Sequence, residues 1–384
     1  RILGHSPALE LLVDEEGTVC GATGIQRQTY ERWVVRAGAV VIATGGCAFL
    51  SRALGCNVLT GDGLLMAAEV GANLSGMEFS NAYGLGAAFA SVTKSLFYQW
   101  ATFYRGDGSA IEGAGSAFGR SLIVQTLQTE PVYAMLDKAD AQVQQWMRGA
   151  QPNFFLPFDR AGLNPFTDRF PITLRLEGTV RGTGGLRLAG SDCATGVAGL
   201  YAAGDAATRE PICGGFTGGG SHNAAWALSS GFWAGAGAAA FGRAHPHTPA
   251  RLVMRAGRAG LQEGGTHATD SDALVRAVQD EVFPYQRNWF RRGDLLEDSL
   301  TRLDALWKRL RNAAPADRTQ AVRTREAAAM LATSRWMYRS ALQRTETRGM
   351  HRRQDHTALD AQQRHRLVSG GLDEVWVERE SVAP

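Results

Sequence analysis

The chain has 384 residues, more than one hydrophobic core usually supports, so two or three domains are expected. Hydrophobic residues make up 45% and charged residues 20% of the sequence, a globular composition that excludes a wholly disordered chain. The net charge of +3 is too small to argue for nucleic acid as a partner, and no apolar run reaches the roughly 18 residues of a membrane span.

The cysteines argue against a metal centre. None of the five stands in a C-x-x-C pair, a common spacing of zinc and iron–sulfur ligands, so no metal site is predicted. Their odd number and their scatter along the chain favour reduced thiols in a cytoplasmic protein. The sequence opens at Arg1 with no leader pattern, so we expect a piece of a larger protein.

The first 46 residues are predicted to form strands. Residues 8–13, 18–26 and 33–36 are strand-like runs separated by turns, a pattern typical of a small antiparallel meander. Residues 39–43 form a short, wholly apolar run that ends in Thr-Gly-Gly. Such a run indicates a strand buried on both faces, as in the parallel sheet of an α/β domain.

The rest of the chain alternates in character. A helix is predicted at residues 64–70, and mixed loops and aromatics follow to about residue 175. A second buried strand is predicted at residues 199–203, ahead of a glycine-rich turn and a helix. Helical spacing returns near the end, at residues 273–291, 295–312 and 317–343. We therefore predict an α/β domain in two parts (1–77 and 176–244), an inserted domain (78–175), a linker (245–272) and a helical C-terminal domain (273–384).

The ends of the two buried strands suggest a cofactor site. Thr44, Gly45 and Gly46 follow the first strand, where open α/β sheets bind ligands and where glycine lets a cofactor approach the backbone. Gly204 and Asp205 follow the second strand, and the carboxylate can accept hydrogen bonds from ribose or ribityl hydroxyls. The alternatives are an ordinary glycine turn and a helix N-cap.

The glycine-rich turn at residues 214–220 leads into a helix that begins near Ser221, His222 and Asn223. A helix N-terminus with a free backbone favours partial negative charge, such as that on the N1–C2=O edge of a reduced flavin. The alternative is a flexible surface loop.

Six segments, in order, match the motifs of one protein family. They are residues 43–46 (ATGG), 60–72 (TGDGLLMAAEVGA), 77–79 (MEF), 183–187 (TGGLR), 200–205 (LYAAGD) and 344–355 (RTETRGMHRRQD). In these segments the chain resembles the flavoproteins of fumarate reductase and succinate dehydrogenase, with L-aspartate oxidase and the adenylylsulfate reductase α subunit as relatives. The resemblance implies FAD held by a Rossmann-like domain of the glutathione reductase type, with an inserted capping domain. It also implies hydride transfer between flavin N5 and a small acid.

Motifs and resemblance together predict which residues bind the cofactor. They are Thr44, Gly45, Gly46, Asp62, Gly204, Asp205, Gly219, Gly220, Ser221 and Asn223. No G-x-G-x-x-G fingerprint stands near the start of the sequence, so the FAD-binding domain is expected to lack its N-terminal, phosphate-binding part.

The catalytic pattern departs from the family. Arg105, in Tyr-Arg-Gly-Asp-Gly, resembles the arginine that acts as the proton-donating acid in the family. The pair Asp-Gly is also a common signal of a hairpin turn, and we favour the turn. The substrate clamps of the family fall at Tyr83, Val180 and Phe216 or Thr217, none of which is a histidine or arginine. A dicarboxylate substrate is therefore disfavoured. Arg181 and His222 are predicted to be the polar groups closest to the flavin edge, with helix capping as the alternative role of His222.

Two features leave alternative functions open. Residues 221–223, 229–231 and 288–291 resemble the adenylylsulfate reductase branch, in which electrons pass to a ferredoxin-type iron–sulfur subunit. The basic cluster at residues 344–353 has two possible roles. It forms either a docking surface for such a partner or the structural ion pairs Arg344–Glu346 and Arg353–Asp355, and we favour the ion pairs. On an exposed face each pair would contribute at most about 1 kcal/mol to stability. The chain is therefore an FAD-dependent oxidoreductase, an electron-transfer subunit or a remnant that binds nothing.

Overall fold

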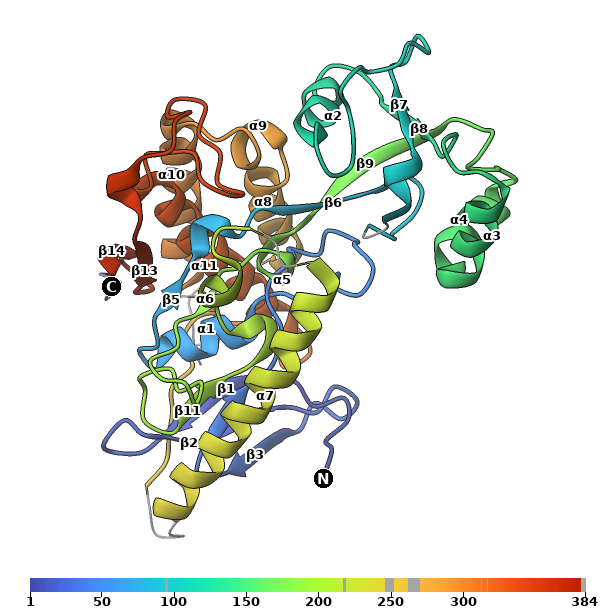
Figure 1. Cartoon of the computed structure of the whole chain (residues 1–384). Coiled ribbons are helices and arrows are strands. Elements are labelled where there is room, and N and C mark those ends of the chain that lie inside the picture. Colours follow the sequence, from blue (N-terminus) through green and yellow to red (C-terminus); the bar gives the residue numbers. More distant parts are fainter. Residues whose placement is uncertain are drawn as a thin grey trace. The chain divides into compact units, whose positions relative to one another are not determined.

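The computed structural model describes residues 1–93, 96–216, 219–245, 252–261, 270–311, 313–315 and 317–380. The chain forms two compact units (Figure 1). Unit 1 comprises Arg1–Phe49, Val58–Ala82 and Glu177–Pro384, and unit 2 comprises Leu50–Asn57 and Tyr83–Leu176. Residues 50–57, assigned to the α/β domain from sequence, thus belong to unit 2, and residues 273–384 do not separate from unit 1. Of the helices described, none is long and apolar enough to cross a membrane.

The predicted N-terminal meander is confirmed. It consists of β1 (Ala8–Val13), β2 (Val19–Ile25) and β3 (Arg32–Arg36), which pair antiparallel in chain order. The short strand β12 (Met254–Arg255) adds to the β1 edge, inside the segment predicted to be a linker. The linker prediction is wrong at this point because residues 254–255 pair with Leu12 and Val13.

A two-stranded parallel sheet lies at the centre of the cofactor prediction. Strand β4 (Val40–Ile42) pairs with β11 (Leu200–Ala202), with Val40 opposite Leu200 and Ile42 opposite Ala202. Helix α7 (Gly219–Ala244) covers one face of this pair, where Ala234 and Ala238 pack against Tyr201 and Val41. Both predicted strands are thus confirmed, and they run in the same direction.

The third sheet of unit 1 corrects the prediction of an all-helical C-terminal domain. Its order is β10 (Gly185–Leu186), β5 (Leu74–Ser75), β13 (Arg366–Gly370) and β14 (Trp376–Glu380), all antiparallel. Residues 366–380 form a hairpin because β13 finds an edge to pair with in β5, where Val368 lies opposite Ser75.

The predicted C-terminal helices form, with one division. The segment predicted as one helix over 273–291 breaks into two because Pro284 cannot continue the first helix and instead stands at the N-cap of the second. The helices are α8 (Ser271–Val282), α9 (Tyr285–Asn288), α10 (Gly293–Leu310) and α11 (Ala321–Gln343). Helix α11 is almost wholly buried and packs against α1 (Asp62–Glu69), α8 and α10. This central position buries polar as well as apolar side chains, among them Arg325, Thr333 and Arg335.

Shorter helices complete unit 1. They are η1 (Met77–Phe79), α5 (Gly178–Arg181), η3 (Gly204–Ala206), α6 (Glu210–Cys213) and η4 (Ala361–Gln363). Arg325 of α11 is buried and ion-paired with Glu69 of α1, which fixes the two helices together. Helix α1 ends at Glu69 with Val70 as its C-cap, and the next residue, Gly71, has a φ of +93°, which suits glycine.

Unit 2 is an antiparallel sheet with helices around an aromatic core. The sheet order is β6 (Ala82–Ala87), β9 (Phe170–Glu177), β8 (Tyr133–Met135) and β7 (Thr102–Tyr104). The helices are α2 (Arg120–Leu127), α3 (Ala141–Ala150), α4 (Pro152–Ala161) and the 3-10 helix η2 (Leu96–Trp100). Phe154 meets Tyr98 edge to face at 5.9 Å and Phe158 meets Phe170 edge to face at 4.7 Å, so aromatic contacts hold this unit together.

Candidate functional site

The carboxyl ends of β4 and β11 meet at one edge of the parallel sheet. Ala203 N–H donates to Ile42 O at 2.9 Å, so the two chains leave the sheet side by side. Residues 44–46 and 204–205 therefore come together at the edge where open α/β sheets bind ligands. The sequence predicted this juxtaposition from the two apolar runs.

Gly46 is needed by the protein's own packing. A Cβ at Gly46 would clash with Thr179 Oγ1, and that hydroxyl accepts a hydrogen bond from Cys47 N–H at 2.7 Å. Gly45 has a φ of +76°, which glycine adopts without strain. The turn after β4 is therefore held against α5, whichever ligand lies beyond it.

Gly204 has room beside it. Its φ is +63°, and a Cβ built there would have Ala227 Cβ, at 4.0 Å, as its one neighbour within that distance. Its N–H donates to Ser230 Oγ at 2.9 Å, and its carbonyl accepts from Trp226 Nε1 at 3.0 Å. Two side chains of α7 thus fasten the helix to the end of β11 and leave space on the glycine's outer side.

Asp205 forms an ion pair instead of the helix cap considered from sequence. Its carboxylate accepts from Arg209, four residues later at the N-cap of α6. The Arg209 side chain is buried and also donates to the carbonyls of Val180, at 3.0 Å, and Gly182. Arg209 therefore fixes the orientation of Asp205 and joins α5 to the turn after β11.

Helix α7 begins where the sequence predicts a helix, so the predicted loop alternative does not hold for Gly219 and Gly220, which lie in its first turn. His222 is exposed. Asn223 is half-buried, and its Oδ1 atom has no hydrogen-bond partner within the described ranges. Ser221 also lies in the first turn, whereas Thr217 lies outside the described residues.

Several buried side-chain oxygens have no hydrogen-bond partner among the described residues. Besides Asn223 Oδ1, Ser80 Oγ and Thr183 Oγ1 are buried without a partner in the part of the chain that is described. Gly184 packs so closely on Ser80 that a Cβ would clash with the hydroxyl. Leaving a buried polar atom unpaired costs about 1–3 kcal/mol, so these oxygens favour a ligand with polar ring edges.

Asp62 stands in the first turn of α1, and Thr60 Oγ1 donates to its carboxylate. Burial raises the pKa of Asp62, and the Thr60 hydrogen bond opposes that rise. The neighbouring Gly63 packs on Thr44, where a Cβ would clash with the hydroxyl. Asp62 and Thr44 therefore lie on adjoining turns at the end of β4.

The three predicted catalytic residues lie in different settings. Arg181 is half-buried at the end of α5, and His222 is exposed at the start of α7, both in unit 1. Arg105 belongs to unit 2 and forms a turn in which Gly108 N–H donates to Arg105 O at 3.1 Å. The hairpin interpretation is thus confirmed. The Arg105 guanidinium pairs with Glu130 at 2.8 Å.

The positions of the family's clamps offer no cation. Tyr83 is buried in β6, Val180 is a buried apolar side chain of α5, and Phe216 is exposed. The structure therefore agrees with the sequence that these three positions hold no histidine or arginine that could bind a substrate carboxylate.

A buried ion-pair network connects two of the family-like segments. Arg344 Nη2 lies 2.7 Å from Glu78 Oε1, and Arg344 Nη1 lies 3.0 Å from Glu346 Oε1. All three side chains are at most 1% exposed. The predicted pairs Arg344–Glu346 and Arg353–Asp355, the latter at 2.7 Å, are confirmed. The expectation of an exposed face was wrong for Arg344–Glu346, which is buried.

A second layer supports this network. Arg291 donates to Glu78 O at 2.6 Å, and its Nη1 lies 2.8 Å from His351 Nδ1. Burial, with the charge of Arg291, holds the pKa of His351 well below its usual value, so the ring is neutral. Asn81 Nδ2 donates to Asn288 O at 3.0 Å and to Met350 O at 3.1 Å. Residues 78–81, 288–291 and 344–355 are thus one structural assembly.

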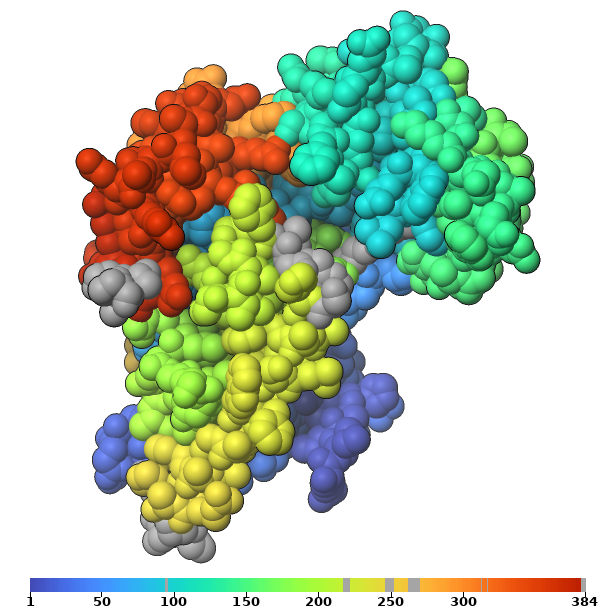
Figure 2. Space-filling view, in the orientation of Figure 1, coloured from blue at the N-terminus to red at the C-terminus, as the bar shows by residue number. Residues whose placement is uncertain are grey.

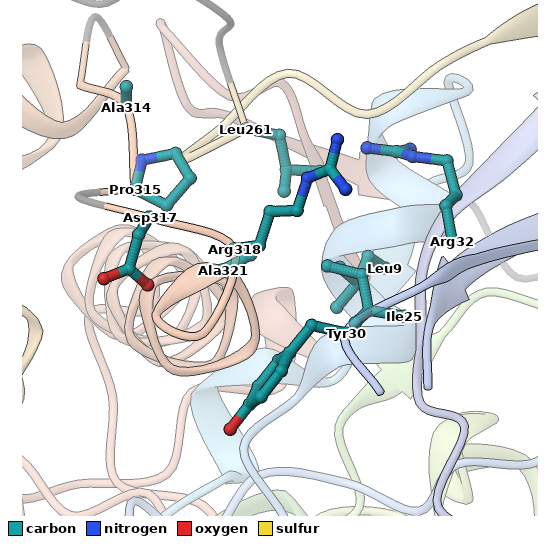
Figure 3. A pocket seen from close by; sticks show the side chains of 10 residues that line it. All are labelled: Leu9, Ile25, Tyr30, Arg32, Leu261, Ala314, Pro315, Asp317, Arg318 and Ala321. Atoms are coloured by element: carbon teal, nitrogen blue, oxygen red, sulfur yellow. The ribbon is translucent and has the colours of Figure 1, made fainter. Parts of the chain in front are cut away.

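Two cavities are present in unit 1, and the smaller one is bordered by Gly214, Gly215 and Phe216 of the glycine-rich turn. One, of about 340 Å³, is lined by Glu210, Cys213, Arg348 and Arg366 among others. Burial and the nearby charge of Glu78 raise the pKa of Glu210 to about 8, a feature with no sequence signal because Glu78 is distant in the chain. The other, of about 600 Å³, is apolar on the side of Leu9 and Ile25 (Figure 3). None of the predicted cofactor residues lines either cavity.

Known proteins match part of this sequence. Residues 279–382 match the family model described as the fumarate reductase flavoprotein C-terminal domain. A fumarate reductase flavoprotein subunit of Mycobacterium tuberculosis is 38% identical over 89 residues. That alignment spans 22% of this chain and 15% of the length of the relative.

Solved structures share the fold of nearly the whole chain. Quinol fumarate reductase FrdA of E. coli matches with a TM-score of 0.77 at 20% identity, covering 98% of this chain and 71% of that one. Mycobacterium smegmatis Sdh1 matches with a TM-score of 0.75 at 23% identity, covering 98% and 66%. Adenylylsulfate reductase of Archaeoglobus fulgidus matches with a TM-score of 0.72 at 17% identity, covering 99% and 72%. The chain therefore has the mixed α/β fold of these flavoproteins, and its residues 279–382 resemble the C-terminal domain of fumarate reductase flavoproteins.

Proposed function

We propose that this chain is the FAD-binding part of an oxidoreductase of the fumarate reductase type. One observation carries the proposal: the parallel pairing brings the turns after β4 and β11 together, and Trp226 and Ser230 of α7 bind Gly204 at that edge. Bound FAD would supply hydride transfer at N5.

The residues at the sheet edge have distinct proposed roles. Gly204 leaves space for the flavin, and Asp205, held by Arg209, accepts hydrogen bonds from ribose or ribityl hydroxyls. Asn223 and Thr183 offer unpaired buried oxygens to the ring edge. Thr44, Asp62 and the backbone of residues 45–46 and 219–221 complete the proposed cofactor contacts.

The proposed substrate is a small organic anion. Arg181 has no ion pair with any described residue, and its half-buried guanidinium is suited to a carboxylate. His222 adds an exposed polar group at the start of α7. The apolar residues at the clamp positions argue against a dicarboxylate held at both ends. Arg105 is the weaker candidate because its charge is already balanced by Glu130.

Gly204→Ala is expected to abolish FAD retention while preserving the fold. The added methyl enters open space in the protein but occupies the side where the flavin would lie, and the strained φ costs only about 1–2 kcal/mol. The measurement is bound flavin per chain, from visible absorbance, in protein purified from its native host.

Gly162→Ala is the matched control. Gly162 has a φ of +66°, also has open space at its Cβ, and ends α4 in unit 2. It carries the same backbone strain without a proposed cofactor contact. Equal flavin content in the two variants, or a wild-type protein without flavin, would contradict the proposed function.

Arg181→Met is expected to weaken binding of a carboxylate probe by about 10- to 150-fold, which corresponds to a charge-assisted bond of about 1.5–3 kcal/mol. Acetate, which has one carboxylate, and succinate, which has two, would be titrated into the flavin-loaded protein. Changes in the flavin spectrum would give their dissociation constants. Arg105→Met is the control, expected to leave the dissociation constants unchanged. Failure of the wild type to bind either probe would exclude the proposed role of Arg181.

The alternative is an electron-transfer subunit like that of adenylylsulfate reductase, working with a ferredoxin-type iron–sulfur partner. The missing clamps favour it. The basic cluster does not, because Arg344, Arg348 and Arg353 are engaged in internal ion pairs. Rapid flavin reduction by a small acid without any partner would favour the oxidoreductase.

A further inference from the structure

The larger cavity of unit 1 lies among elements that carry no predicted cofactor or catalytic residue. Its walls come from β1, β2, β3, the turn between β2 and β3, the loop at residue 261, and the segment that leads into α11. Its volume of about 600 Å³ is typical of a cavity that binds a small molecule. The chemistry of the lining residues indicates which kind of molecule fits.

The floor of this cavity is apolar. It consists of Leu9, Ile25, Leu261 and Ala321, each of which is at most 9% exposed. These four side chains belong with Val322 to one hydrophobic cluster. An apolar group that covers this floor leaves water, and this transfer favours binding.

Two arginines line the same cavity and have donors to spare. Arg318 is exposed, and its side chain makes no hydrogen bond or ion pair with any described residue. Arg32 donates through Nη1 to the buried Glu10 at 2.9 Å, which leaves its Nε and Nη2 without an acceptor among the described residues. Figure 3 shows the guanidinium groups of Arg32 and Arg318 pointing toward one another. Two like charges repel in this arrangement, and an anion between them would be attracted to both.

Asp317 does not supply that anion. It is the one carboxylate among the described lining residues, and it accepts from the backbone N–H groups of Thr319 at 2.7 Å and Gln320 at 3.1 Å. In Figure 3 its carboxylate points away from the guanidinium of Arg318. Asp317 therefore serves the turn before α11 and leaves Arg318 available to a ligand.

Tyr30 forms part of the rim, where the cavity opens to solvent. Its side chain is 42% exposed, and the N-terminal strands, blue in Figure 2, lie at the surface of unit 1. Its φ of +57° lies in the left-handed region, where glycine, asparagine and aspartate are the usual residues. Bulky side chains in this conformation concentrate at binding sites, where the surrounding structure holds them.

We propose that this cavity binds an amphipathic monocarboxylate. Its carboxylate lies between Arg32 and Arg318, and its apolar body covers Leu9 and Ile25. The two guanidinium groups select the anion, and the floor selects the apolar body. A short dicarboxylate fits less well, because its second charge would lose water against the apolar floor. The proposal does not rest on FAD binding, since it uses no residue of the proposed cofactor site.

The test is isothermal titration calorimetry on the protein purified from its native host. Octanoate is the probe, and octanamide has the same shape without the charge. The wild type is expected to bind octanoate more tightly than octanamide. Arg318→Met should weaken octanoate binding by about tenfold, as for one partly exposed charge-assisted contact, and leave octanamide binding unchanged.

Two further variants serve as controls. Arg160→Met makes the same change in net charge at an exposed position at the end of α4 in unit 2, and should leave both affinities unchanged. Tyr30→Asn removes the ring but suits the left-handed backbone, so the variant should fold. It is expected to weaken both probes to a similar extent, because both lose the same apolar contact.

Four results would overturn the proposal. They are a wild type that does not bind octanoate, equal affinities of the wild type for octanoate and octanamide, equal losses in Arg318→Met and Arg160→Met, and octanoate binding that Arg181→Met abolishes but Arg318→Met does not. The last result would place the carboxylate at the sheet edge instead of in this cavity.

Discussion

Arg344→Met is expected to destabilise unit 1 by about 3–5 kcal/mol, the cost of leaving buried charges without their partner. The variant removes the ion-pair partner of Glu78, which is fully buried, and leaves Glu346, also fully buried, with Arg348 as its remaining partner. It also removes donors to the carbonyls of Gln363 and His365, each at 2.9 Å. Denaturant unfolding followed by circular dichroism would measure the loss, which at this size corresponds to a Tm lower by on the order of 10 °C.

Arg348→Met is the matched control for that prediction. Arg348 binds the same Glu346, at 2.6 Å, but is 25% exposed and does not contact Glu78 in any hydrogen bond or ion pair described. Its loss is expected to cost about 1 kcal/mol, as for a partly exposed pair. Adding Glu78→Gln to Arg344→Met should restore part of the stability, since it removes one stranded charge. Equal costs for the two single arginine variants would show that burial does not set the strength of the network.

Elements with local signals could be predicted from the sequence. The apolar runs at residues 8–13, 39–43 and 199–203 gave strands, and Gly71 marked a helix end. The hairpin at residues 366–380 could not be predicted, because the stability of β13 depends on pairing with β5, a strand of two residues far earlier in the chain. Short strands of this kind have no periodicity of their own.

The candidate site divides in the same way. Glycine turns after two buried strands were sufficient to predict that residues 44–46 and 204–205 meet. Asp205 pairs with Arg209, a basic residue four positions later in the sequence. That spacing allows an ion pair, whereas the role considered for Asp205 from the sequence was a helix cap. The burial of Glu78 and its closeness to Glu210 had no local signal, because only the fold brings residues 78, 210 and 344 together.

Glu210→Gln is expected to remove a loss of stability at high pH. The folded pKa of Glu210 is about 8, against 4.5 for the free side chain, because of burial first and then repulsion by Glu78. The folded state therefore binds more protons than the unfolded state between these two pH values. Stability is highest below about pH 4.5 and falls as the pH rises towards 8, by about 3–5 kcal/mol from this group.

Glutamine reproduces the protonated form, which is why the variant should match the wild type near pH 5 and exceed its stability near pH 9. The amide can still accept the hydrogen bond that Ser75 Oγ donates to Glu210. Unfolding free energies from denaturant titrations at several pH values would give the difference between the two proteins. Glu15→Gln, at an exposed position, corrects for the change in net charge. Parallel pH profiles for wild type and Glu210→Gln would mean that Glu210 ionises in the folded protein as readily as in the unfolded chain, and the cavity beside Arg366 would then hold a charged carboxylate at neutral pH.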